Sequence, residues 1–469
     1  MFDNEEDDYK DGAFQEDLNK FEEMIQAGSS IFFDSDRLET MLDHFLMNNQ
    51  FKNALACVNH GLYHFPANAT FKIRKAQVLS AMGKLDEALN LLIEVEKLVV
   101  DDQEYLLTRA SVHSQLRDAK SAIRYFERAL KQSDGEEKDE IYLDLSMEYQ
   151  AMNDLKSAIR ILKEALDENP ANETAVYELA FCYDQIGEVE HAIGCYESYI
   201  DINPYSFTTW YNLGNAYSKS ENFEKAAWAY DYSIIVNDRF SSAYFNLGNT
   251  YVSLGKYRAA IDSFTKCIEL DGEDAVTLDY IGEAHEQLEE YELALHYYKR
   301  SMDLAPELPD PWLGTGIVLD LMGRSAEGIH YIRKAAEMES GNADYWHVLA
   351  GCAIKLNFLD EAENALKRGL ELQPDSDEIL IDYAKLVALE NANLAIELIE
   401  QNIQNQEDVG ESRLLLIKLY WFSGRQSDAL LLFKDLVFMH STIAKKLFLH
   451  FEEAESIPQF IQLFELIQD

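Results

Sequence analysis

The sequence predicts an all-α solenoid built from stacked helix pairs. The first observation is a repeated tetrapeptide, Asn-Leu-Gly-Asn, which occupies residues 212–215 and again residues 246–249, a spacing of 34 residues. The second is a small residue that recurs at nearly the same interval along most of the 469-residue chain. A period between about 20 and 50 residues is typical of supersecondary units that stack on one another.

The small residue marks the second half of every unit. Its successive spacings are 34 residues, apart from one of 36 and one of 33. The positions are Ala54, Ala88, Ala122, Ala158, Ala192, Ala226, Ala260, Ala294, Gly328, Ala362, Ala395 and Ala429. A register that is kept over so many units indicates a continuous array. Gly328 is expected to be a weaker joint, because glycine inside a helix costs roughly 1 kcal/mol relative to alanine.

Each unit divides into two helices. In the reference unit, apolar and small residues recur at helical spacing in both halves: Trp210, Leu213, Gly214 and Tyr217, then Phe223, Ala226, Ala227, Tyr230 and Ile234. The turn between the halves carries Gly or Asn, which tolerate the left-handed backbone at a helix end: Asn49, Gly83, Asn153, Gly187, Gly255, Gly323, Asn357 and Gly424. Proline stops the second helix in five units: Pro66, Pro170, Pro204, Pro306 and Pro374.

These residues together resemble the tetratricopeptide repeat, in which Trp, Leu-Gly and Tyr lie in the first helix, Ala and an aromatic in the second, and Pro at the exit. The resemblance covers nearly the whole chain and implies a right-handed superhelix. We expect about twelve repeats over residues 35–442, an acidic N-terminal arm and lead-in helix over residues 1–34, and a capping helix pair over residues 443–469.

The ends of the array depart from the pattern. Residues 1–23 hold ten Asp or Glu, which favours a mobile arm that becomes helical near 17–26. The third unit is stretched near Gly135, and the unit that begins near Asp377 is one residue short. Beyond 442 we expect two short helices hinged at Ile457-Pro458, with apolar side chains that close the core: Phe448, Phe451, Phe460, Ile461, Phe464 and Ile467.

Composition excludes several classes of ligand. The net charge of −45 disfavours nucleic acid and an anionic membrane surface, although it is compatible with a basic protein partner or with a role in solubility alone. The N-terminus lacks the features of a secretory signal, and no run of 18 uncharged apolar residues occurs. Five scattered cysteines fit reduced thiols. We therefore expect a cytoplasmic protein without membrane insertion.

No catalytic or cofactor motif is recognised. Cys182, Cys195 and His191 share one unit and were weighed as a nucleophile pair, but the core face of that helix is already set by Ala192 and Tyr196. Residues such as His285 are interpreted as core or edge side chains and not as metal ligands. The sequence contains no P-loop and no calcium loop. We expect no enzyme activity, cofactor or metal.

The candidate binding residues lie on the first helices, on the side that faces away from the second helices. In relatives of this superfamily an asparagine there often grips a peptide backbone, because its amide both donates and accepts. The predicted peptide-binding residues are Asn212, Asn215, Asn246 and Asn249, with Tyr211, Phe245, Glu178 and Tyr280. Acidic residues surround them on the same face: Glu104, Glu140, Asp144, Glu283, Asp310 and Asp344.

Two functional hypotheses follow. The first is a scaffold or adaptor that binds extended, amide-compatible or basic peptide segments in the concave groove. The second is a structural or assembly subunit that docks through its convex face or its C-terminal helices, where Leu430, Leu431, Leu432, Phe433 and Phe438 offer apolar surface. A carboxylate clamp is not expected, because the unit after the asparagines offers Asp279 and Glu283 and no basic residue.

Overall fold

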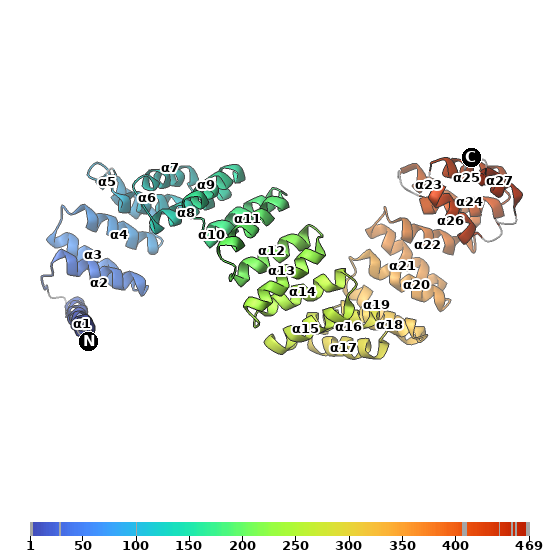
Figure 1. Ribbon diagram of the computed structural model, residues 1–469, viewed down its shortest axis with the longest axis horizontal. Coiled ribbons are helices and arrows are strands. Elements are labelled where there is room, and N and C mark those ends of the chain that lie inside the picture. Colours follow the sequence, from blue (N-terminus) through green and yellow to red (C-terminus); the bar gives the residue numbers. More distant parts are fainter. Residues whose placement is uncertain are drawn as a thin grey trace. The chain divides into compact units, whose positions relative to one another are not determined.

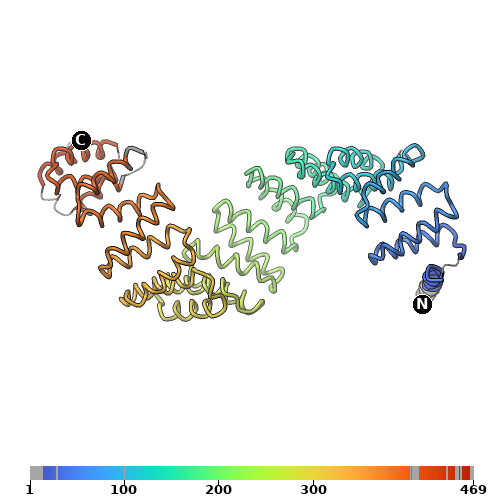
Figure 2. Tube along the Cα trace, turned by 180° about the vertical axis from the view of Figure 1, so that it is seen from behind, coloured from blue at the N-terminus to red at the C-terminus, as the bar shows by residue number. Residues whose placement is uncertain are grey.

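The computed structural model describes residues 3–27, 30–99, 101–405, 410–439, 441–451, 454 and 457–465. Helices follow one another along these residues, and no strand occurs in them. Figure 2 shows the trace running back and forth in consecutive helical hairpins. The predicted all-α class and solenoid architecture are confirmed.

The pairs α2/α3 to α24/α25 form the array (Figure 1). Their first helices are α2 (Ser35–Met47), α4 (Ala69–Ala81), α6 (Gln103–Gln115), α8 (Glu136–Ala151), α10 (Glu173–Gln185), α12 (Phe207–Lys219), α14 (Ser241–Ser253), α16 (Ala275–Gln287), α18 (Asp310–Leu321), α20 (Ala343–Lys355), α22 (Asp377–Ala388) and α24 (Gly410–Phe422). Their second helices are α3 (Phe51–His64), α5 (Leu85–Val95), α7 (Ala119–Leu130), α9 (Leu155–Glu168), α11 (Val189–Ile202), α13 (Phe223–Val236), α15 (Tyr257–Asp271), α17 (Tyr291–Leu304), α19 (Ser325–Met338), α21 (Leu359–Leu372), α23 (Ala392–Asn405) and α25 (Gln426–Met439). The small residue of the register is the fourth residue of every second helix.

Helix packing explains the Leu-Gly pair and the aromatic that follows it. A Cβ placed on Gly214 or Gly248 would lie 2.5 Å from the ring of Tyr230 or Phe264 on the second helix of the same pair. Both rings are buried. The glycines are therefore required where an aromatic ring lies directly on the backbone of the first helix.

The tryptophans bind the start of their own units. The indole Nε1 of Trp210 donates to the carbonyl of Pro204 at 2.8 Å, and that of Trp312 donates to the carbonyl of Pro306 at 3.1 Å. Both acceptors lie six residues earlier, in the connection between pairs. Tryptophan therefore fixes the entry of the chain into a first helix while its ring packs between helices.

The turns within pairs use the left-handed backbone as predicted. Positive φ angles occur at every Gly and Asn of the predicted set, and also at Arg117, Glu221 and Glu289, which hold the same place in their units. In the unit that is one residue short, the turn after α22 continues through Leu389 with right-handed φ and ψ. The missing residue is therefore the left-handed one.

Two glycines of α11 and its preceding turn are expected to respond oppositely to alanine. Gly187 has a φ of +79°, whereas Gly194 lies inside α11, and a Cβ would meet no atom within 4 Å at either site. Gly187→Ala should destabilise the protein by about 1 kcal/mol because a left-handed backbone disfavours Cβ. Gly194→Ala should stabilise it by about 1 kcal/mol. Urea unfolding of the two variants checks the sign of each effect, and equal signs would contradict the assignment of the turn.

The chain forms two compact units, residues 1–236 and 237–469. Within each unit, first helices of successive pairs contact one another, as α4 contacts α6, α8 contacts α10, and α16 contacts α18. The first helices therefore line one side of each unit, which we call the inner face. The unbroken register of the sequence gave no sign of this division.

The N-terminal helix is longer than predicted. Helix α1 spans Asp3–Ala27, so the predicted mobile arm is wrong for the described residues before 17. Phe21 is fully buried against Phe33 and Phe45, which anchors α1 to the first pair. Acidic residues at its beginning are favourable next to the positive end of the helix dipole.

The C-terminal end is closed by α26 (Ser441–His450) and α27 (Pro458–Glu465). Phe451 and Phe460 are buried, and the Phe460 ring lies 5.1 Å from that of Phe433 on α25. Phe448 and Phe464 pack against this cluster, whereas Ile461 is partly exposed and Ile467 lies outside the described residues. Most of the predicted apolar side chains therefore do cover the last pair.

Candidate binding surface

The predicted asparagines lie on the inner face, and the two copies belong to different compact units: Asn212 and Asn215 to the first, Asn246 and Asn249 to the second. All four side chains are partly buried. The hydroxyl of Tyr230 donates to Asn215 Oδ1 at 2.7 Å. This asparagine therefore joins the helices of its own pair in addition to facing the surface.

The other predicted site residues pack with their neighbours. The ring of Tyr211 lies 5.9 Å from that of Tyr230, and Glu178 accepts a hydrogen bond of 2.9 Å from Gln150. In the second unit, Tyr280 stacks on Phe264 at 5.6 Å, and Phe245 lies 5.8 Å from Tyr280. The structure thus brings Phe245 and Tyr280 together over Phe264, as adjacent parts of the inner face.

Next to Tyr280 four carboxylates gather: Asp279, Glu283 and Glu286 of α16, and Asp310 at the start of α18. We call this group the acidic cluster. Asp279 Oδ1 is buried and accepts no hydrogen bond in the described part of the chain. Burial, together with the charges of Asp310, Glu283 and Glu286, raises the pKa of Asp279 to about 8.

The remaining carboxylates of the cluster are held by tyrosines. Tyr298 donates to Glu286 Oε2 at 2.8 Å, and Tyr345 of α20 donates to Asp310 Oδ1. Burial also raises the pKa of Glu283 and of Glu286. No Lys or Arg of the described residues forms an ion pair with any member of the acidic cluster. The cluster is therefore negative charge held away from water without a positive partner, an arrangement that is costly.

A smaller acidic site occurs on the inner face of the first unit. A cavity of about 470 Å³ lies among α4, α6 and α8, and it is lined by Gln77, Thr108, Glu137, Glu140 and Asp144 among others. Burial and the neighbouring charges of Glu140 and Glu148 raise the pKa of Asp144 to about 6. The expectation of acidic surroundings on this face thus has a structural counterpart in each unit.

The cysteines and histidines do not form a reactive pair. Burial raises the pKa of Cys182 and that of Cys195 to about 11, so both are protonated thiols at neutral pH. His191 Nδ1 lies 3.1 Å from Glu188, and the buried His285 lies 2.8 Å from Glu290. Among the described residues no three His, Cys, Asp or Glu side chains are arranged to hold a metal ion.

Sequence reasoning missed two features of this surface. It named Asp279 only as the absence of a basic residue, and it did not single out Glu286; both lie on the same face of α16 as Glu283, at spacings of four and three residues, which was the available signal. It also expected surplus apolar surface near the C-terminus from five side chains. Phe433 is buried, and only Leu431 and Phe438 of that group are exposed.

A tandem array of helix pairs with a continuous inner face defines a protein-interaction scaffold. Sequence models described as tetratricopeptide repeat match residues 149–204, 207–230, 241–274, 281–308 and 321–381. A further model, described as the N-terminal TPR repeats region of Psidin, matches residues 37–157. Together these matches cover more than half of the chain, which belongs to the tetratricopeptide repeat family.

Solved structures share this fold. The APC/C hetero-tetramer Cut9-Hcn1 is 15% identical over 88% of this chain and 95% of that chain, with a TM-score of 0.42. A tetratricopeptide repeat protein from Parabacteroides merdae is 20% identical over 53% and 98%, with a TM-score of 0.43. YrrB, a TPR protein with an unusual peptide-binding site, is 24% identical over 39% and 95%, with a TM-score of 0.32. A search of curated proteins finds no match. No helix in the described residues is long and apolar enough to cross a membrane.

Proposed function

We propose that this protein is a non-catalytic, cytoplasmic scaffold that binds extended partner segments on its inner face, and that the acidic cluster receives a Lys or Arg side chain of the partner. The observation that carries the proposal is the buried, unpartnered Oδ1 of Asp279 among three other carboxylates. A cation placed there would gain charge-assisted hydrogen bonds. It would also remove the repulsion between the carboxylates.

Neighbouring side chains supply what a peptide needs besides charge. Phe245 and Tyr280 form an aromatic wall beside the cluster, and Asn246 and Asn249 lie on the same unit within the preceding first helix. Aromatic side chains provide rigid apolar contact, and amides bind a peptide backbone through both donor and acceptor. A basic segment fits this combination better than nucleic acid, whose phosphates the carboxylates would repel.

The proposal predicts how the affinity for a basic peptide depends on pH and on the cluster. A fluorescent eight-residue peptide of alternating Lys and Ser should bind, with an affinity that rises between pH 6 and pH 8. Binding of a cation favours the ionised form of Asp279, whose pKa is about 8 in the free protein. Asp279→Asn combined with Glu283→Gln should weaken binding at pH 8 by about tenfold or more and remove the pH dependence. Fluorescence anisotropy at fixed ionic strength measures both.

The matched control is Asp262→Asn, which removes an exposed carboxylate from the second helix α15 and should leave the affinity unchanged. Asn212→Ala combined with Asn246→Ala tests the asparagines separately and should also weaken binding. Unchanged binding in both the cluster variant and the asparagine variant would remove the inner face from the function.

The alternative function, an assembly subunit that docks through its convex face or C-terminal helices, is supported by the exposed Leu431 and Phe438 on α25. Affinity purification from the native cell distinguishes the two functions. A partner bound on the inner face should be lost from the Asp279→Asn and Glu283→Gln variant, whereas a partner docked through α25 should remain.

A further inference from the structure

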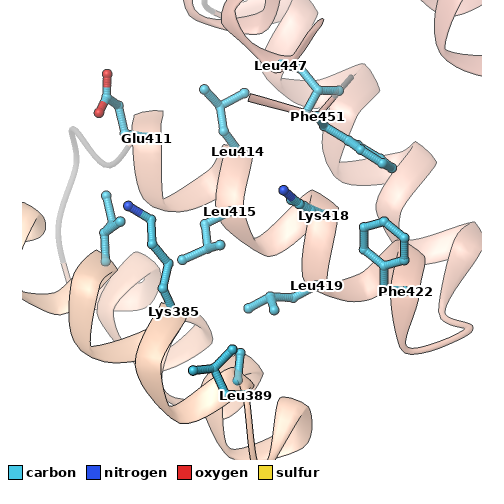
Figure 3. A pocket seen from close by; sticks show the side chains of 12 residues that line it. Lys385, Leu389, Glu411, Leu414, Leu415, Lys418, Leu419, Phe422, Leu447 and Phe451 are labelled. Atoms are coloured by element: carbon cyan, nitrogen blue, oxygen red, sulfur yellow. The ribbon is translucent and has the colours of Figure 1, made fainter. Parts of the chain in front are cut away.

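The C-terminal part of the second unit contains an apolar cavity whose chemistry differs from that of the acidic cluster. Its volume is about 400 Å³, within the range of small ligand pockets. It lies on the inner face, between α22, α24 and α26, and Figure 3 shows the side chains that surround it. Its apolar walls include Ile381, Leu414, Leu415, Leu419, Leu447 and Phe451.

Two large apolar side chains at this cavity remain in contact with water. Leu389 is 72% exposed and Phe422 is 62% exposed, although both line the cavity. Leu389 is the residue that continues the shortened turn after α22, so the missing residue of this unit is what places a leucine there. Exposed apolar side chains around a concave apolar surface mark a binding site for another apolar group.

The charged residues that line the cavity are mainly basic. Lys385 reaches into the space from α22 and Lys418 from α24 (Figure 3). The one lining carboxylate, Glu411, forms an ion pair of 2.5 Å with Lys446 of α26. In a chain with a net charge of −45, this cavity is therefore a place where an acidic ligand meets lysines instead of carboxylates.

We propose that this cavity binds a short acidic segment of a partner protein through a bulky apolar side chain, Leu or Phe, with flanking Asp or Glu residues next to Lys385 and Lys418. The apolar anchor would supply most of the affinity, since buried anchors in a pocket dominate peptide binding. The lysines would select acidic over basic flanks and raise the association rate. This site is separate from the acidic cluster, and its ligand has the opposite charge.

The test uses the full-length protein and three labelled twelve-residue peptides. The first carries Leu and Phe among Asp and Glu, the second replaces Leu and Phe with Ser, and the third replaces Asp and Glu with Lys. We expect the first peptide to bind at least tenfold more tightly than the second. It should also bind more tightly than the third in the Asp279→Asn and Glu283→Gln variant, where the acidic cluster cannot compete for lysines. Equal affinity of the first and second peptides would overturn the proposal.

Surface substitutions locate the binding. Phe422→Ser should weaken binding of the first peptide about tenfold, and Lys385→Glu combined with Lys418→Glu should weaken it and reduce its dependence on salt. Phe438→Ser is the matched control, because Phe438 is 81% exposed on α25 and does not line the cavity. An equal loss for Phe422→Ser and Phe438→Ser would contradict the location. A dimer that Phe422→Ser converts to monomer, together with no binding of the first peptide, would show that a second copy covers the cavity and would overturn the proposal.

Discussion

Replacing Gly328 with alanine is expected to lower the free energy of unfolding by about 2 kcal/mol, although alanine occupies this position in the other units. A Cβ at Gly328 would lie 2.6 Å from the carbonyl oxygen of Gly316 and 3.3 Å from the backbone nitrogen of Asp320. Both obstacles are backbone atoms of α18, which cannot move aside as a flexible side chain can. Overpacking of this kind typically costs 1–3 kcal/mol.

This result reverses the expectation for a glycine judged by helix propensity alone, under which alanine would stabilise α19 by roughly 1 kcal/mol. Gly316 and Gly328 face each other and allow α18 and α19 to approach backbone to backbone. Gly328 is therefore a packing requirement and not simply a weak joint. Gly351→Ala is the control, because that glycine lies inside α20 with no atom within 4 Å of a Cβ.

Urea unfolding followed by circular dichroism measures both variants. Because stability in repeat arrays is carried by neighbouring units, hydrogen exchange should show the loss concentrated in α18 and α19. A Gly328→Ala protein as stable as the Gly351→Ala protein would mean that the two helices separate without cost.

Replacing Asp279 with asparagine is expected to flatten the dependence of stability on pH. The pKa of Asp279 is about 8 in the folded protein and about 3.9 in an unfolded chain. The folded state therefore holds a proton that the unfolded state releases between these values. Asp279 favours folding fully below pH 4, and this contribution is lost as the pH rises through 8.

Between pH 5.5 and pH 8, the wild type should lose on the order of 2–3 kcal/mol of stability that the Asp279→Asn variant retains. The difference between the two proteins isolates Asp279, because other carboxylates of raised pKa, such as Asp144, remain in both. The exposed Asp262→Asn variant should follow the wild type. Parallel curves for wild type and Asp279→Asn would show that Asp279 is ionised in the folded protein throughout this range.

The acidic cluster also connects stability with binding. Its carboxylates lower the stability of the free protein at high pH, and a cationic side chain would reverse that loss on binding. The Asp279→Asn variant should therefore be stabilised less by the Lys-Ser peptide than the wild type at pH 8. Sites that are costly in the free protein are frequently the ones used for function.

The sequence by itself determined the helix pairs, their register and most of their turns. These depend on local patterns: apolar spacing along one helix, a small residue at a fixed place, and Gly or Asn where the backbone is left-handed. The two irregular units were also visible, because an insertion or deletion shifts the register. The extra residues lengthen α8 to 16 residues, and the deletion removes the left-handed residue after α22.

Only the tertiary structure decided which side chains are desolvated or trapped against a neighbouring helix. Asp279 differs from an ordinary surface carboxylate because α16, α18 and α20 together exclude water from it, and no pattern within α16 specifies that. The role of Gly328 depends on the distance between two backbones, and the C-terminal cavity depends on three helices from successive units. The asparagines that first marked the repeat lie on the predicted face, but Asn215 also bonds Tyr230, a contact set by how two helices pack.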